Sequence, residues 1–132
     1  AMFELIDDIE SIADSCFNLA KILYRKRHGN IEFTEEIIQN MITMFALVDE
    51  ALAEMQRNLT VEYNDINSTK AIEMEEKINN YRNQLREEHL LNVKDGVYNY
   101  KTGVIYNELF STAEKLADYI INVTESIQEA KK

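Results

Sequence analysis

Carboxylate and amide side chains recur at four-residue intervals in two stretches of the sequence. The two sets are Glu10, Asp14 and Asn18 and, 104 residues later, Glu114, Asp118 and Asn122. Side chains four residues apart lie on one face of an α-helix, so each set would form a ladder of oxygen atoms. Two carboxylates at this spacing repel by about 0.2–0.5 kcal/mol, a cost that a bound cation reverses. Oxygen ligands suit hard or borderline cations, so both ladders predict metal binding.

The two ladders differ at the next position along the helix, and the second ladder is the more favourable of the two predicted metal sites. Glu125 extends the second ladder, whereas Lys21 stands at the equivalent place in the first. At about 100° per residue, the second ladder lies nearly opposite the apolar seam of Leu109, Leu116 and Ile120. The first ladder has the same placement on its helix, so we expect the carboxylates of both ladders to face outward. The alternative interpretation of both ladders is the solvated face of an acidic protein, because short acidic motifs are common on helices.

The composition limits the class of protein that carries these ladders. The chain has 132 residues and a mass of 15.4 kDa, which is enough for one domain, 1–132, with a single core. A formal net charge of −10 argues against nucleic-acid binding, which requires a basic surface. No apolar run reaches the roughly 20 residues of a membrane-spanning helix. Acidic residues near the start argue against a secretory signal, and the single cysteine indicates a reducing compartment.

The distribution of apolar residues predicts an all-α fold. Proline is absent and glycine occurs three times, which favours long helices over a β-sandwich or barrel. Apolar steps of three and four predict helices at about 2–28, 34–63, 66–93 and 103–130, packed as an antiparallel four-helix bundle. Gly29-Asn30 is the predicted left-handed end of the first helix, and Thr34 is the predicted cap of the second. The segment 94–103 is predicted to be a loop that contains Tyr98 and Tyr100.

The remaining reactive side chains are better explained by structure than by catalysis, and we expect no enzyme. The apolar stripe of the first helix is predicted to consist of Leu5, Ile9, Ile12, Cys16, Leu19 and Leu23. Because Cys16 lies on that stripe, we expect a buried, inert thiol. His28 and His89 both lack a glutamate three residues earlier, so the ligand pair of di-iron bundles is missing. The cations at 25–28 are expected to complement the helix dipole, with an anionic membrane surface or a phosphate as the alternative partner.

The second ladder and the residues before it resemble a known family. Glu114-Lys-Leu-Ala-Asp118, followed by Asn122 and Glu125, is similar to the Glu/Asp-x-x-x-Asp signature of PhoU-type phosphate regulators. Glu10-Ser-Ile-Ala-Asp14 with Asn18 is similar to a second copy. Upstream, the resemblance continues in order through Ile78-Asn79, Leu85-Arg86, His89, Gly96 and Tyr106-Asn-Glu-Leu109. That order is similar to the PhoU-like domain fused behind bacterial sodium/phosphate cotransporters, and the resemblance covers most of the chain.

The resemblance implies a PhoU-like helical bundle whose signature carboxylates hold metal ions or small metal clusters at its surface. By position, the implied ligands are Glu10, Asp14, Glu114 and Asp118, with Asn18 and Asn122 as accessory ligands. The implied metals are divalent or trivalent ions of iron, zinc or manganese. Family members often have arginine after the glutamate and histidine after the aspartate. This chain instead has Ser11, Lys115, Ser15 and Tyr119 at those positions.

The resemblance also implies a cytoplasmic protein with a regulatory role in phosphate uptake, at the inner face of the plasma membrane. The implied partners are the membrane domain of a fused or separate transporter, or phosphate-signalling proteins. A full PhoU-type protein has two three-helix repeats, and Ala1 before Met2 is typical of a cloning remnant. We therefore expect this chain to be part of a longer protein, holding the end of one repeat and all of the next. A free-standing PhoU-type regulator is the alternative in the same class, and an acidic scaffold that forms homo-oligomers without metal is the alternative in another.

Overall fold

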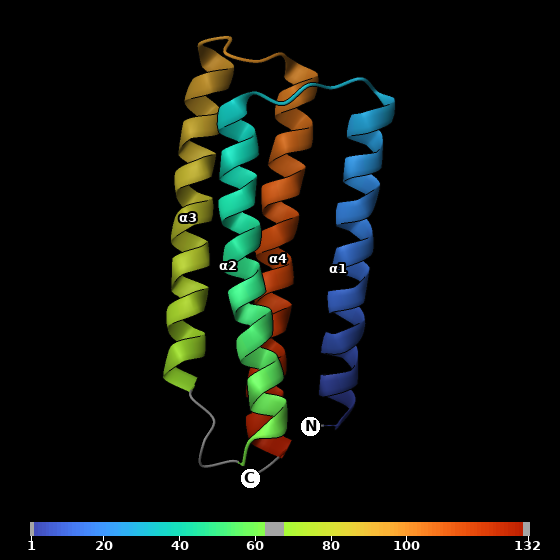
Figure 1. Cartoon of the computed structure of the whole chain (residues 1–132), viewed down its shortest axis with the longest axis vertical. Helices are drawn as coiled ribbons and strands as arrows, with labels where there is room; N and C mark the ends of the chain where they lie inside the picture. The colour runs from blue at the N-terminus through green and yellow to red at the C-terminus, as the bar shows by residue number, and fades with distance from the viewer. Residues whose placement is uncertain (1, 63–67, 131–132) are drawn as a thin grey trace.

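The computed structural model describes residues 2–62 and 68–130, which contain four helices (Figure 1). These are α1 (Met2–His28), α2 (Glu35–Thr60), α3 (Ser68–Lys94) and α4 (Tyr100–Ala130). Successive helices run in opposite directions, so the topology is up-down-up-down. The prediction of an all-α protein with four packed helices is confirmed. Within the described ranges, no helix is long and apolar enough to cross a membrane.

The connection from α1 to α2 has the geometry that its residues predict. Asn30 has a positive φ of 51°, and the Ile31 amide donates to the Lys26 carbonyl at 3.0 Å, which closes the end of α1. At the start of α2, the Thr34 hydroxyl accepts a hydrogen bond from the Ile37 amide at 3.2 Å. The end of α1 and the start of α2 are therefore both determined by short-range hydrogen bonds.

Some predicted helix bounds were wrong. α2 ends at Thr60 rather than at 63, and the predicted start of the third helix at 66 lies outside the described residues. α4 begins at Tyr100, so the last residues of the predicted loop are helical. Asn99 explains this earlier start, because its side-chain oxygen accepts a hydrogen bond from the Thr102 amide at 2.9 Å. Gly103 then lies inside the helix, where an added Cβ would be 3.1 Å from the His89 Cε1 atom.

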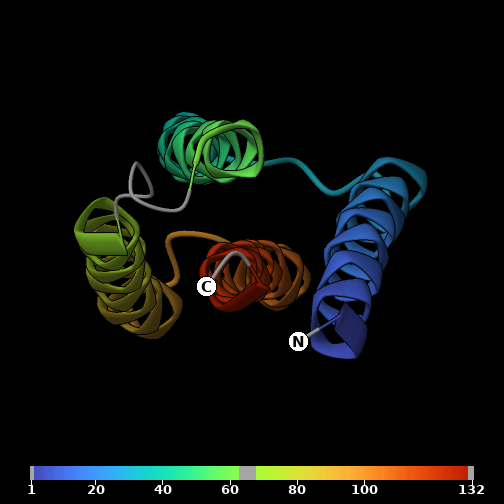
Figure 2. The same cartoon turned by 90° about the horizontal axis from the view of Figure 1, so that it is seen from below.

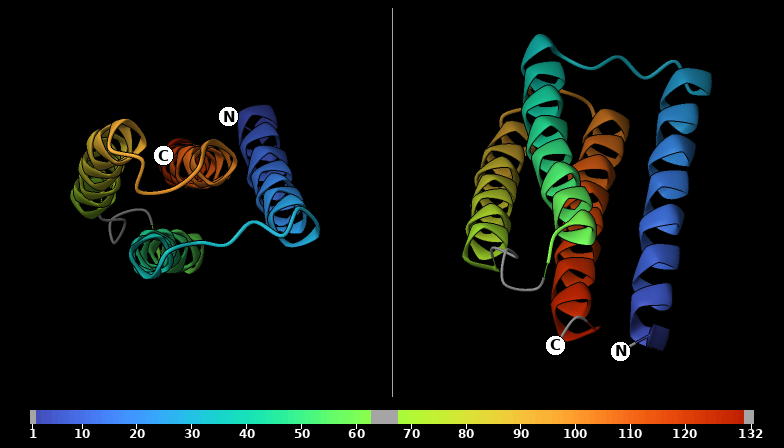
Figure 3. Two further views of the ribbon diagram at one scale, coloured as in Figure 1. Left: turned by 90° about the horizontal axis from the view of Figure 1, so that it is seen from above. Right: turned by 60° about the horizontal axis from the view of Figure 1, so that its bottom comes forward.

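α4 is the central helix, because α1, α2 and α3 all pack against it (Figure 2). α2 also packs against α3, so α2, α3 and α4 enclose a three-helix core. Its fully buried side chains include Met44, Leu85, Phe110 and Ile120. α1 lies beside α4 and apart from α2 and α3 in both end-on views (Figures 2 and 3). The architecture is therefore a three-helix unit with a fourth helix along one side.

The buried side of α1 differs from the predicted stripe. Ser15 and Ile22 are buried, and Ile12 and Leu19 are half-buried against the core. The members of the predicted stripe that are exposed instead are Ile9, Cys16 and Leu23. The prediction of a buried thiol was therefore wrong. Because α1 packs mainly against a single helix, it buries one narrow seam and leaves the rest of its apolar surface uncovered.

Candidate acidic site on α3 and α4

The second ladder lies at the contact between α3 and α4. The Glu114 Oε2 atom is 2.8 Å from the Arg82 Nη2 atom of α3, and the two side chains are only 15% and 18% exposed. The prediction that these carboxylates face outward was therefore wrong for Glu114. A helical wheel of α4 cannot show this, because the position of α3 decides which sides of α4 are covered.

Four acidic side chains interact electrostatically at this contact. Burial raises the pKa of Glu114 and Asp118, and the Arg82 guanidinium opposes the rise in each. The Asp118 carboxylate raises the pKa of Glu114 further. On α3, burial raises the pKa of Glu75, and the carboxylates of Asp118 and Glu125 add to that rise. The second ladder is thus part of a mutually repelling acidic group in which Arg82 is the main opposing cation.

The α3 side of this site was missed by the sequence analysis. Glu75, Arg82 and Arg86 are separated by seven and four residues, so they share one face of α3. That spacing is a usable signal for a charged helix face, but it does not identify the helix that the face contacts. Arg82 Nε has no hydrogen-bond partner among the described residues, and Nη2 carries the ion pair to Glu114.

The first ladder lies on the exposed surface of α1. Glu10, Asp14 and Asn18 are all exposed, as predicted. Asn18 also lines a groove between α1 and α4, which Arg25 and Glu108 bridge with an ion pair. The structure places no described helix beside this ladder in the way that α3 lies beside the second. The two copies of the motif therefore have different surroundings.

The structure does not bring the two ladders together into one metal site. Among residues 2–62 and 68–130, no group of three or more histidine, cysteine, aspartate or glutamate side chains is arranged to hold a metal ion. Asn122 is exposed. It lines a shallow depression together with Glu4, Asp7 and Asp8 from the start of α1. A cation at Glu114 and Asp118 would compete with Arg82 and would need water to complete its coordination shell. Metal binding by the ladder residues remains a prediction.

Residues that carry the family resemblance form the packed contact beneath this site. The buried ones are Ile78, Leu85, Tyr106 and Leu109. The Nδ1 atom of His89 is 2.5 Å from the Tyr98 hydroxyl, and burial lowers the pKa of His89, which favours the neutral imidazole. Burial also raises the pKa of Tyr106 to about 12. The His89 ring also lies edge-on to the rings of Tyr106 and Phe110, at centroid distances of 5.8 and 6.0 Å. These two ring contacts join α3 to α4.

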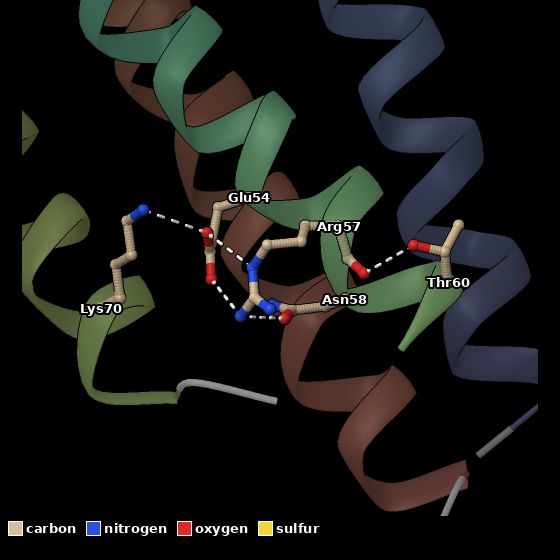
Figure 4. Close-up of polar contacts among 5 residues, drawn as sticks. All are labelled: Glu54, Arg57, Asn58, Thr60 and Lys70. Carbon is tan, nitrogen blue, oxygen red and sulfur yellow. Dashed lines mark hydrogen bonds and ion pairs between the residues drawn. The ribbon is translucent and has the colours of Figure 1, made fainter. Parts of the chain in front are cut away.

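A separate charged cluster joins α2 to α3 (Figure 4). The Glu54 side chain is only 4% exposed, and its carboxylate oxygens lie 3.0 Å from Arg57 Nη2 and 3.3 Å from Lys70 Nζ. Arg57 also donates a hydrogen bond to the Asn58 side-chain oxygen at 3.2 Å. The hydrogen bond from Arg57 is the main reason that the pKa of Glu54 is lowered. Because both cations contact one carboxylate, we assign this cluster a structural role.

The geometry defines an all-α protein with an acidic, partly buried site between two helices. No protein-family model, curated protein or solved structure matches the chain. The function is therefore inferred from the motifs and from the surroundings that the structure gives them.

Proposed function

We propose that this chain is a PhoU-like regulatory domain associated with sodium-dependent phosphate transport. It would act on a transporter membrane domain or on phosphate-signalling proteins at the inner face of the plasma membrane. The observation that carries the proposal is the internal repeat and its placement. Both copies of Glu-x-x-x-Asp-x-x-x-Asn lie on helices, α1 and α4, that pack side by side in opposite directions (Figure 1).

The contact between α1 and α4 follows the same repeat. The Ser126 hydroxyl donates a hydrogen bond to Asp8 at 3.4 Å, and Ile22 and Thr112 line one groove between the helices. A shift of 104 residues along the chain leads from Asp8 to Thr112 and from Ile22 to Ser126. The pair Asp8 and Ser126 is therefore equivalent to the pair Thr112 and Ile22. An approximate two-fold relation between α1 and α4 accounts for this correspondence. A repeated unit of this kind supports the PhoU-like proposal.

We also propose that the second ladder is the main metal-binding site of the domain. Glu114 and Asp118 lie in a partly buried acidic group, and the raised pKa of each shows that ionisation is costly there. A divalent or trivalent cation would relieve that repulsion, as Arg82 does in part. Manganese, iron and zinc are the candidate ions. The first ladder is the weaker candidate because Glu10 and Asp14 are exposed and Lys21 follows them.

The metal part is tested by thermal unfolding with and without each ion, for the original sequence and two double variants. A hundredfold excess over the dissociation constant should stabilise the original protein by about 2.7 kcal/mol. Glu114→Gln with Asp118→Asn should abolish this increase, whereas Glu10→Gln with Asp14→Asn should reduce it less. Each double variant removes two charges, so each controls for the general electrostatic effect in the other. If the α4 variant keeps the full metal-dependent shift, the proposed ligands are wrong.

The transport part is tested in the organism that carries the gene. Replacing the chromosomal codons for Glu114 and Asp118 should alter sodium-dependent uptake of radiolabelled phosphate while transporter abundance stays constant. Uptake that is unchanged at both low and high external phosphate would contradict the regulatory role. The uptake assay and the melting assay are independent, so metal binding and transport regulation can fail separately.

An acidic assembly scaffold without metal is a second candidate, and one observation favours it. α1 exposes apolar side chains such as Ile9 and Phe17, which are 49% and 64% exposed. Sedimentation combined with metal analysis separates the two functions. A stable oligomer free of metal would favour the scaffold, and a metal-loaded species would favour the regulatory domain.

A further inference from the structure

α1 has a second apolar seam that none of the described helices covers. Its residues step by three and four along the helix and are Ile6, Ile9, Ala13, Cys16, Ala20 and Leu23. All six are exposed, including Ile6 and Ile9 at 49% and Leu23 at 44%. This is the spacing of a coiled-coil seam. The seam that faces α4 contains Ser15 and Ile22 and lies on another side of α1.

The internal repeat identifies the face of α4 that is equivalent to the exposed seam of α1. A shift of 104 residues maps its six positions onto Phe110, Ala113, Ala117, Ile120, Thr124 and Ile127 of α4. All six of these residues are buried, in the helix against which α2 and α3 pack (Figure 2). α1 therefore has a face equivalent to one in α4. In α4 this face packs against other helices, whereas in α1 no described helix covers it. Single apolar residues scattered over a surface need no explanation, but these six exposed residues form one continuous seam.

The charges along α1 indicate which helix fits this seam. The first half of the helix carries Glu4, Asp7, Asp8, Glu10 and Asp14, and the second half carries Lys21, Arg25, Lys26, Arg27 and His28. A helix with the same order of charges fits best when it runs in the opposite direction, because each acidic half then lies beside a basic half. A second α1 meets this requirement and also supplies an identical apolar seam.

We propose that two copies of this chain associate through the exposed seams of their α1 helices, antiparallel and related by a two-fold axis. With the seams fully overlapped, Ile9 of one copy packs against Ala20 of the second copy, and Ala13 packs against Cys16. Small side chains near the axis allow the two helices to approach closely. Glu10 follows Ile9 and Lys21 follows Ala20, so Glu10 of one copy and Lys21 of the second lie on the same side of the helix pair. The Lys21 ammonium, which lies 5.0 Å from the centre of the Phe17 ring in the single chain, turns toward Glu10 in the dimer, and the symmetry forms this pair twice. The association extends the scaffold candidate by naming its surface and its partner, and it depends neither on metal binding nor on phosphate regulation.

The first test is the mass of the 132-residue chain in solution, measured by sedimentation equilibrium and light scattering. The expected result is a dimer, with twice the chain mass of 15.4 kDa. Ile9→Glu should give a folded monomer, because Ile9 is already 49% exposed. Ile42→Glu is the matched control: Ile42 is 56% exposed on α2, so the same change there should leave the dimer intact. A monomeric original protein, or a dimer that Ile9→Glu does not weaken, would overturn the proposal.

The second test is a charge reversal that examines the orientation of the two helices. Glu10→Lys and Lys21→Glu should each weaken the dimer about tenfold in dissociation constant, because each turns two attractive contacts into repulsive ones. The combined variant should recover the original affinity, since the pairs form again with reversed signs. Failure of the combined variant to recover would overturn the antiparallel register.

Cys16 provides a third, chemical measurement. It lies within one helical turn of the proposed axis, so a short bifunctional thiol reagent should link two chains, and Ile9→Glu should prevent this. The thiol should also react more slowly as the protein concentration rises, because the dimer covers it. If a helix pair of another polypeptide covers the seam instead, the isolated chain will show no crosslink and no concentration dependence. That result would overturn the assignment of a second copy.

Discussion

Replacing Arg82 by methionine should destabilise the protein, because it removes the cation that lies 2.8 Å from Glu114. Methionine keeps much of the apolar volume of the arginine side chain, so the change mainly tests the charge. Loss of one partner from a fully buried ion pair costs about 3–5 kcal/mol. The side chains of Glu114 and Arg82 remain 15% and 18% exposed, so we expect a smaller cost of about 1–3 kcal/mol. For a domain of this length, the melting temperature should fall by roughly 3–12 °C.

The cost of Arg82→Met should depend on pH. Burial raises the pKa of Glu114 and Asp118, and Arg82 opposes that rise. A carboxyl with a raised pKa in the folded state contributes stability that is present below its unfolded pKa. That contribution is lost as the pH increases through the folded pKa. Without Arg82 both folded pKa values rise further, so the cost should be largest at neutral pH and shrink as the carboxyls are protonated in acid.

Urea unfolding at neutral pH and at roughly pH 4 measures both effects. Glu114→Gln, added to Arg82→Met, should recover part of the lost free energy, because the unpaired carboxylate is then absent. Lys77→Met removes an exposed cation from the same helix and serves as the control. The role assigned to the ion pair would be refuted if Arg82→Met were as stable as the original protein. It would also be refuted if the cost changed neither with pH nor with Glu114→Gln.

Two further substitutions test the end of a helix and the contact between two helices. Asn99→Ala removes the oxygen that accepts from the Thr102 amide, so it should cost about 1 kcal/mol and increase amide exchange in the first turn of α4. An unchanged melting temperature and exchange rate would exclude Asn99 as the cap. Glu54→Gln should cost about 1–2 kcal/mol at neutral pH, because it removes the carboxylate that Arg57 and Lys70 share. The pKa of Glu54 is lowered, so its contribution is present above the unfolded pKa and is lost as the pH falls through the folded pKa. Unfolding free energies of variant and original should converge in acid, and a gap that persists at roughly pH 2 would contradict this reasoning.

Features that depend on nearby residues could be predicted before the fold was known. The four helices follow from apolar periodicity, and the cap at Thr34 follows from a hydrogen bond that spans three residues. The wrong start of α4 also has a local cause, since Asn99 precedes Thr102 by three residues and caps the helix there. Such interactions lie within one turn of the chain, so their partners are visible in the sequence.

Only one side of the candidate site could be predicted in this way. Glu114, Asp118 and Asn122 share a face of α4 because of helix geometry alone. Arg82 and Glu75 belong to α3, and no spacing within α4 indicates that they lie beside the ladder. The repulsion and partial burial that distinguish this site arise only when the two helices pack.

The sequence by itself determined that two matching carboxylate ladders exist and that each lies on one helix. Only the tertiary structure decided that Glu114 is partly buried and paired while Glu10 is exposed. Ile120 and Cys16 occupy equivalent positions in the repeat and differ in the same way, since the first is buried and the second exposed. The physical reason is that burial depends on what lies beside a helix. α4 has three neighbouring helices and α1 packs mainly against one, and this difference arises from the packing of the whole chain rather than from either segment alone.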